Sequence, residues 1–381
     1  MALDLALFGS KLRSLREQFG LAADDIAAAT GISALGLESY EAGAGEPTGD
    51  DILILADYFK CDYRFFISNE RLTPFEQTEK LFRRWGQELS RGDRWAIQEF
   101  LFLCECEEDL MRALRRERVE PPTITKRGNF LKQQGVEAAQ ALRRHFGYAA
   151  HALPRDVYED FRRAGAHVFR RKLENSSISG LYLKHPVAGP CILVNYSEDV
   201  FRQRFTAAHE MAHALLDAEE DFVVSFTWDQ KALSEVRANA FASQYLVPTE
   251  FLRLIQDGGA WGERQALEWA EKLRVNPAVL ANALERDRLV GVETAAAIRA
   301  LRVPMAAKQD PELPVDLSAM ARVRREAMLQ RGLSTFYVEL CFEAYREGHI
   351  TAGRLSEVLL VPPAELDSLA HTFGRGLIYA D

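Results

Sequence analysis

The sequence predicts a multidomain protein: an all-helical domain, a helical connector, an α+β domain and an all-helical C-terminal segment. Three observations predict this order. The 381 residues are enough for two or three separate hydrophobic cores. Apolar residues recur at helical spacing over the first 70 residues and again after residue 290. Between these regions, three short stretches within 167–195 have the pattern of strands, and helices flank them.

Composition and charge exclude several classes of protein. With 48% hydrophobic and 27% charged residues, the chain has the composition of a soluble globular protein. A net charge of -9 argues against a surface built throughout for nucleic acid, because phosphate neutralisation needs clustered Lys and Arg. No apolar run is long enough to span a membrane, and charges interrupt the first 20 residues. We expect a cytoplasmic protein with reduced, structural cysteines.

The first domain is expected at residues 1–70, where Phe8, Leu12 and Leu15 have helical spacing. A helical connector at 71–124 ends at a pair of prolines. The α+β domain is expected at 125–290 and the helical C-terminal domain at 291–381. Residues 350–366 echo the apolar spacing of 21–37, either as a second helix-turn-helix-like unit or, as we favour, as a helical packing module.

Within the α+β domain, two helices should come first, followed by three strands and then two more helices. The expected elements are helices at 136–146 and 155–164, strands at 167–173, 178–184 and 191–195, and helices at 198–216 and 233–246. A loop with two prolines separates the second and third strands, so we expect a small antiparallel sheet.

The helix at 198–216 carries a metal-binding pattern. His209 and His213 are four residues apart, so both imidazoles lie on one face and can reach one zinc ion at about 2.0–2.1 Å. Glu210 follows the first histidine and is the expected general base for the attacking water, whose pKa zinc lowers toward about 7. The next helix supplies Glu235 as a third ligand, because a catalytic zinc usually has three protein ligands. Asn239, one turn later, should orient a ligand histidine.

The motif has two alternatives to a catalytic zinc. The histidines could be core residues with satisfied hydrogen bonds, or the zinc could be structural. A structural site is disfavoured because no Cys or His lies nearby to fill the fourth position. The ligand set also suits iron. Four side chains are candidates for polarising a scissile carbonyl, and the sequence does not choose among them: Tyr182, His185, Tyr196 and Tyr245.

Five segments carry a resemblance to a known family: 177–182, 191–195, 202–213, 235–242 and 246–248. With them, residues 136–250 resemble the ImmA/IrrE family of bacterial zinc metallo-endopeptidases. The resemblance implies a gluzincin-like fold in which the strand Cys191–Asn195 receives an extended peptide by strand addition. It also implies cleavage of a helix-turn-helix repressor, which relieves repression after DNA damage or in mobile elements.

Residues 8–68 resemble the Cro/CI-type helix-turn-helix domain, with a recognition helix at 33–42. That helix contains no basic residue, and Asp24 and Asp25 stand where the family usually has phosphate-contacting residues. DNA binding through residues 1–70 is therefore left open, beside a role in dimerisation or in docking a related repressor. No individual residue is assigned to nucleic-acid binding.

Together the patterns predict a zinc-dependent endopeptidase that cleaves a helix-turn-helix transcriptional repressor in a bacterial stress or mobile-element response. The alternative is a DNA-binding regulator whose metallopeptidase-like domain senses a ligand without cleaving. The sequence favours the peptidase because its ligand set is complete, whereas the recognition helix lacks basic side chains. The sequence leaves open whether the protein forms a homodimer.

Overall fold

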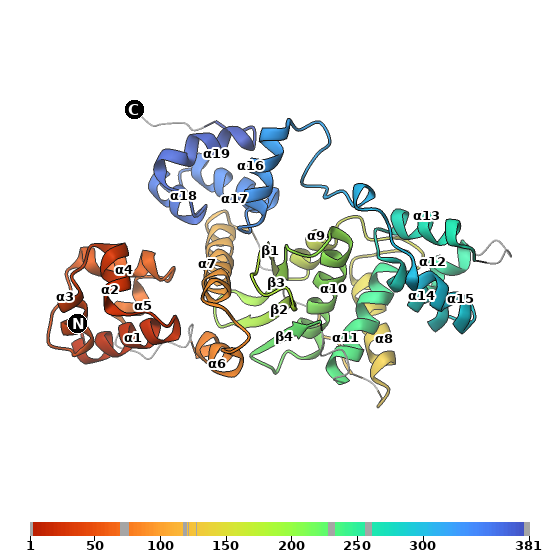
Figure 1. Ribbon diagram of the computed structural model, residues 1–381, viewed down its shortest axis with the longest axis horizontal. Helices are drawn as coiled ribbons and strands as arrows, with labels where there is room; N and C mark the ends of the chain where they lie inside the picture. The colour runs from red at the N-terminus through yellow and green to blue at the C-terminus, as the bar shows by residue number, and fades with distance from the viewer. Residues whose placement is uncertain are drawn as a thin grey trace. The chain divides into compact units, whose positions relative to one another are not determined.

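Figure 1 shows the computed structural model, which describes residues 3–68, 76–116, 120, 122–126, 128–227, 233–255 and 261–376. The chain divides into two compact units, residues 1–103 with 185–187, and 104–184 with 188–381. The predicted fold class is confirmed, with an N-terminal helical region, a mixed α+β middle and a helical C-terminal part. The division into four domains stays a prediction. No helix among the described residues has the length and hydropathy needed to cross a membrane.

The first unit is helical. Its elements are α1 (Leu5–Gln18), α2 (Ala23–Thr30), α3 (Ala34–Glu41), α4 (Gly49–Tyr58), α5 (Arg64–Ile67), α6 (Glu76–Trp85) and the first half of α7 (Arg91–Ala113). The side chains of Phe8, Leu12 and Leu15 are buried, as their helical spacing predicts. Gly9 lets α1 approach α3 closely, because a Cβ there would lie only 2.2 Å from the carbonyl oxygen of Tyr40.

The second unit contains a four-stranded sheet in the order β1-β3-β2-β4. The strands are β1 (His167–Arg171), β2 (Ile178–His185), β3 (Gly189–Asn195) and β4 (Phe222–Phe226). The sheet is mixed and not antiparallel throughout, because β1 pairs with β3 in parallel. The short turn after β2 makes β3 run opposite to β2, which returns it to the direction of β1. Strand β4, which pairs antiparallel with β2, was not predicted.

This strand order corrects one expectation about substrate binding. Strand β3, which contains Cys191–Asn195, lies between β1 and β2, so both of its edges are paired and it cannot accept an added strand. Within the described chain the edges of the sheet are β1 and β4. A peptide that extends this sheet must therefore pair with one of those two strands.

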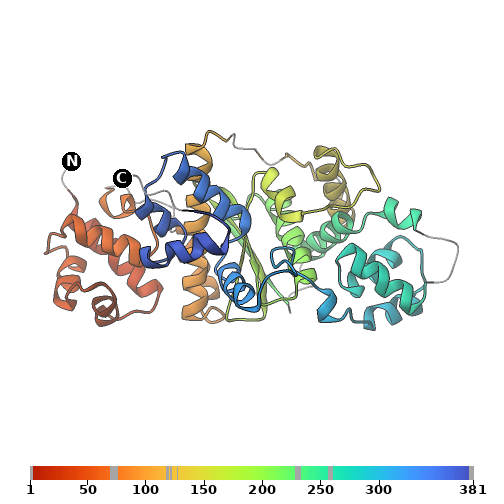
Figure 2. The same cartoon turned by 90° about the horizontal axis from the view of Figure 1, so that it is seen from above.

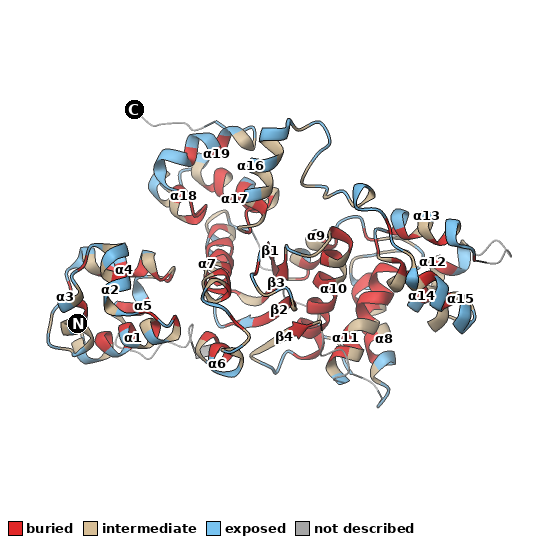
Figure 3. Ribbon diagram, viewed as in Figure 1, coloured by how far each residue is buried: buried red, intermediate tan, exposed pale blue. Residues whose placement is uncertain are grey.

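Helices cover the sheet and form the metal-binding region. The elements here are α8 (Leu131–His145), α9 (Val157–Arg163), α10 (Val200–Leu216) and α11 (Leu233–Leu246). Helix α10 packs on β3 and against α11 (Figures 1 and 2). Both helices are largely buried in the core (Figure 3). Gly135 of α8 permits close packing on α11, since a Cβ there would lie 2.3 Å from the carbonyl oxygen of Arg237.

The rest of the second unit is helical. Its elements are α12 (Thr249–Leu254), α13 (Glu263–Leu273), α14 (Pro277–Arg286), α15 (Val292–Ala300), η2 (Met305–Ala307), α16 (Ala319–Leu329), α17 (Thr335–Arg346), α18 (Ala352–Val358), η3 (Pro363–Glu365) and α19 (Leu366–Thr372). Helices α13 and α14 contribute buried leucines and alanines to the same core as α8, α10 and α11. Helix α14 is thus held in a fixed position beside the metal-binding helices α10 and α11.

Candidate metal centre

Helix α10 begins at an N-cap aspartate and places two histidines one turn apart. The side chain of Asp199 accepts hydrogen bonds from the backbone N–H groups of Phe201 and Arg202. His209 is 6% exposed and His213 is fully buried. The apolar face of the helix is packed in the core, so both imidazoles are held on the side that faces α11.

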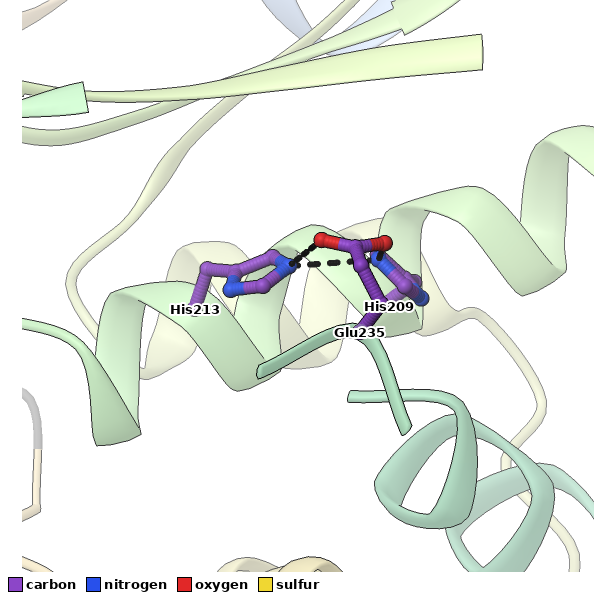
Figure 4. A group of neighbouring side chains, drawn as sticks. All are labelled: His209, His213 and Glu235. Carbon is purple, nitrogen blue, oxygen red and sulfur yellow. Dashed lines mark hydrogen bonds and ion pairs between the residues drawn. The ribbon is translucent and has the colours of Figure 1, made fainter. Parts of the chain in front are cut away.

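The two histidines and Glu235 converge on one point (Figure 4). The Nε2 atoms of the histidines are 3.2 Å apart, and each lies 3.0 or 3.2 Å from an oxygen of Glu235. Two ligand atoms bound at 2.0–2.1 Å to a tetrahedral metal stand about 3.3 Å apart. The donor set and its spacing therefore fit one zinc ion.

The outer nitrogen of each histidine has an acceptor. Nδ1 of His209 lies 3.1 Å from the side-chain oxygen of Asn239, and Nδ1 of His213 lies 2.8 Å from Asp217. Arg237 donates to the other oxygen of Asp217. These contacts place a proton on Nδ1 and leave Nε2 free to bind a metal. Asn239 was singled out from the sequence. Asp217 was missed, although its position one turn after His213 was a usable signal.

Charges around the centre favour an ionised carboxylate and a protonated His213 when no metal is bound. Burial acts to raise the pKa of Glu235, but hydrogen bonds from both histidines hold the pKa at about 2. Burial acts to lower the pKa of His213, but Asp217 and Glu235 raise it to about 9. Metal binding must therefore displace a proton from His213.

Glu210 lies next to the two histidines and is fully buried. Burial raises the pKa of its carboxyl group above the usual value. The hydroxyl of Ser225 on β4 lies close to the carboxyl group and acts to lower its pKa, although neither oxygen of Glu210 has a partner at full hydrogen-bond geometry among the described residues. Gly180 of β2 packs against this carboxylate, since a Cβ on Gly180 would lie 2.7 Å from Oε1. The sequence did not reveal this role of the glycine.

A cleft of about 1300 Å³ opens beside the centre. His209, Glu235 and Asn239 line it, together with residues of β2, β4, α8, α10 and α14. Four predicted candidates for polarising a carbonyl are not among its described lining residues: Tyr182, His185, Tyr196 and Tyr245. Tyr245, for example, is buried and its hydroxyl donates to Asp160.

Fold and site together define a metallopeptidase-like domain joined to a helix-turn-helix domain. Residues 161–285 match the model of a family named as peptidases, described as the IrrE N-terminal-like domain. Residues 7–63 match a helix-turn-helix domain. No curated protein and no solved structure matches the chain. The chain thus carries an IrrE N-terminal-like domain and an N-terminal helix-turn-helix domain, which confirms both resemblances noted in the sequence.

Proposed function

We propose that the protein is a zinc-dependent endopeptidase. The observation that carries this proposal is the three-ligand centre of His209, His213 and Glu235, with the carboxylate of Glu210 beside it. Binding pockets for small ligands usually enclose about 300–1,000 Å³. The cleft next to this centre is larger, which suits an extended peptide.

His209, His213 and Glu235 would hold the metal, and Asn239 and Asp217 would keep the imidazole rings in place. The zinc ion, when bound, supplies Lewis-acid polarisation of the scissile carbonyl and lowers the pKa of the attacking water. Glu210 takes a proton from that water and passes it to the leaving amine.

The substrate adds as an extended strand to the side of β4 that faces away from β2. This strand pairs with β2 alone among the described strands, and Ser225 and Phe226 at its end line the cleft. Backbone hydrogen bonds along an edge strand hold a peptide of any sequence in register, while pockets select its side chains. Strand β4 thus replaces Cys191–Asn195 as the place for strand addition.

The protein substrate is a helix-turn-helix repressor in a bacterial stress or mobile-element response. The helix-turn-helix match over residues 7–63 supports this choice, because the chain itself carries a relative of the expected target. The same match favours a second candidate function, a DNA-binding regulator that does not cleave. The acidic residues Asp24 and Asp25 at the start of α2 weigh against it, since carboxylates repel phosphates.

Substitution of the general base tests the peptidase. Glu210→Gln should retain about one zinc per chain by elemental analysis and lose turnover of a protein substrate by several orders of magnitude. His213→Ala should lose most of the metal, because only two ligands remain. Full turnover by Glu210→Gln would refute the mechanism. Absence of metal from the wild type, even after incubation with zinc, would move the regulator to first place.

A further inference from the structure

The carboxylates and cations that line the cleft are unevenly paired. Each of the four lining carboxylates has a positively charged or imidazole partner. The pairs are Glu235 with His209 and His213, Asp199 with Lys308, Glu285 with Arg299, and Asp287 with Arg286. None of these carboxylates is therefore left to attract a basic substrate.

Three lining cations keep unused donors: Lys132, Arg202 and Arg302. Within the described chain, Lys132 has no carboxylate partner, and Arg302 donates only to backbone carbonyls at the end of α15. The six lining cations outnumber the four carboxylates, although the whole chain has a net charge of -9. The lining thus carries more cations than carboxylates, although Glu198, which lies outside the lining, offsets part of the charge of Arg202.

Arg202 is the best placed of the three. Its Nε donates to Glu198 at 2.6 Å, which fixes the side chain one turn along α10. Its two terminal nitrogens make no hydrogen bond within the described chain, and the side chain is 41% exposed. A guanidinium held in this way offers two parallel N–H groups that match the two oxygens of a carboxylate.

We infer that the cleft selects a peptide segment with acidic side chains, and that Arg202 binds one of them about three residues from the scissile bond. The inference rests on the proposed peptidase function. Arg202 and His209 are seven residues apart, so they share a face of α10 about 10.5 Å apart along its axis. An extended peptide covers this distance in about three residues.

Cleavage of a proteome-derived peptide library, read by mass spectrometry, tests the inference. Wild-type enzyme should enrich Asp and Glu about three residues from the cleaved bond. Arg202→Glu should lose this enrichment and favour Lys and Arg, whereas the matched control Arg264→Glu, at an exposed side chain of α13, should cleave like wild type. No acidic enrichment, or the same enrichment in Arg202→Glu, would overturn the inference.

A binding experiment distinguishes a failure of this inference from a failure of the proposed peptidase function. Two pools of random 12-residue peptides are compared, identical except that Gln and Asn replace Glu and Asp in one. Zinc-loaded Glu210→Gln should bind the acidic pool about tenfold more tightly in competition anisotropy, even if the wild type cleaves nothing. Equal affinity for both pools would refute the inference alone. If Arg202→Glu does not fold, Arg302→Glu replaces it and should weaken acidic-pool binding several-fold; unchanged binding would count against the inference.

Discussion

The contact between Gly180 and Glu210 gives a sharp test of the general base. A Cβ at position 180 would lie 2.7 Å from Oε1 of Glu210 and 2.7 Å from Cγ2 of Thr206. Ordinary contacts of a Cβ begin near 3.4 Å. In Gly180→Ala we expect the carboxylate to retreat by about 0.7 Å (3.4 minus 2.7), because it is the end of a flexible side chain.

The expected effect follows from that displacement. A reacting group misplaced by about 1 Å can lose roughly 10²-fold in rate, so a shift of about 0.7 Å should lower kcat by roughly 25-fold. Overpacking of the buried site should also destabilise the fold by about 1–3 kcal/mol. Metal content should stay at the wild-type value, since the three atoms nearest to the new methyl group belong to Glu210 and Thr206 and to none of His209, His213 and Glu235.

The assay compares kcat, zinc content and thermal midpoint for Gly180→Ala and a matched control. Gly353→Ala in α18 is suitable because the nearest neighbour of its Cβ would be 3.8 Å away. Its kcat and zinc content should match the wild type, and its thermal midpoint should be equal or slightly higher, because Ala favours a helix over Gly. Wild-type kcat in a folded, metal-loaded Gly180→Ala would refute the reasoning. Either Gly180 does not set the position of Glu210, or Glu210 is not the base.

Three further predictions concern other parts of the chain. Asp217→Asn should weaken zinc affinity about 10-fold to 100-fold in a chelator competition, because His213 loses its charged acceptor; unchanged affinity would assign Asp217 a purely structural role. Burial would lower the pKa of His167, but Glu107, 2.9 Å away, and Glu108 raise it from 6.5 to about 10. Its contribution to the free energy of unfolding should be full below pH 6.5 and disappear as pH rises through about 10. Urea titrations should show a flatter pH dependence for His167→Gln, and an equal slope would exclude this histidine. In residues 3–68 every basic side chain donates to an internal acceptor, so duplex DNA should bind weakly and only at low salt. Nanomolar binding at physiological salt, measured by anisotropy, would contradict this.

The metal ligands could be predicted because a helix converts sequence spacing directly into geometry. The spacing of His209 and His213 puts two imidazoles on one face without any tertiary information. The convergence of Glu235 on the same point depends on how α11 crosses α10, which the sequence indicated only through its helical pattern and a family resemblance. Asp217 and Asn239 follow the same one-turn rule, so both were within reach of sequence reasoning.

The sheet was harder to predict because strand order is a tertiary property. The residues of β4, Phe222 to Phe226, show no clear alternation of polar and apolar side chains and follow an acidic turn, so no local pattern marked them as a strand. β3 runs parallel to β1 because β2 carries the chain back in the opposite direction before β3 begins. The pattern of residues within each strand contains no information about this direction. The cleft wall on α14 comes from residues more than 60 positions after the histidines.

The centre has the composition of a site built for chemistry. A structural zinc normally has four Cys or His ligands, whereas the group found among the described residues has three ligands. No Cys or His occurs in the stretches outside the described residues, so these cannot supply a fourth ligand of that kind. Beside it, the two buried oxygens of Glu210 have no well-formed hydrogen bond among the described residues, only the nearby hydroxyl of Ser225, and poorly paired buried groups of this kind destabilise a fold by about 1–3 kcal/mol or more. A centre that only held α10 to α11 would gain nothing from that cost. A peptidase would benefit, because the carboxylate can act as the general base for an attacking water. The three-ligand centre and the poorly paired carboxylate therefore both support the proposed peptidase.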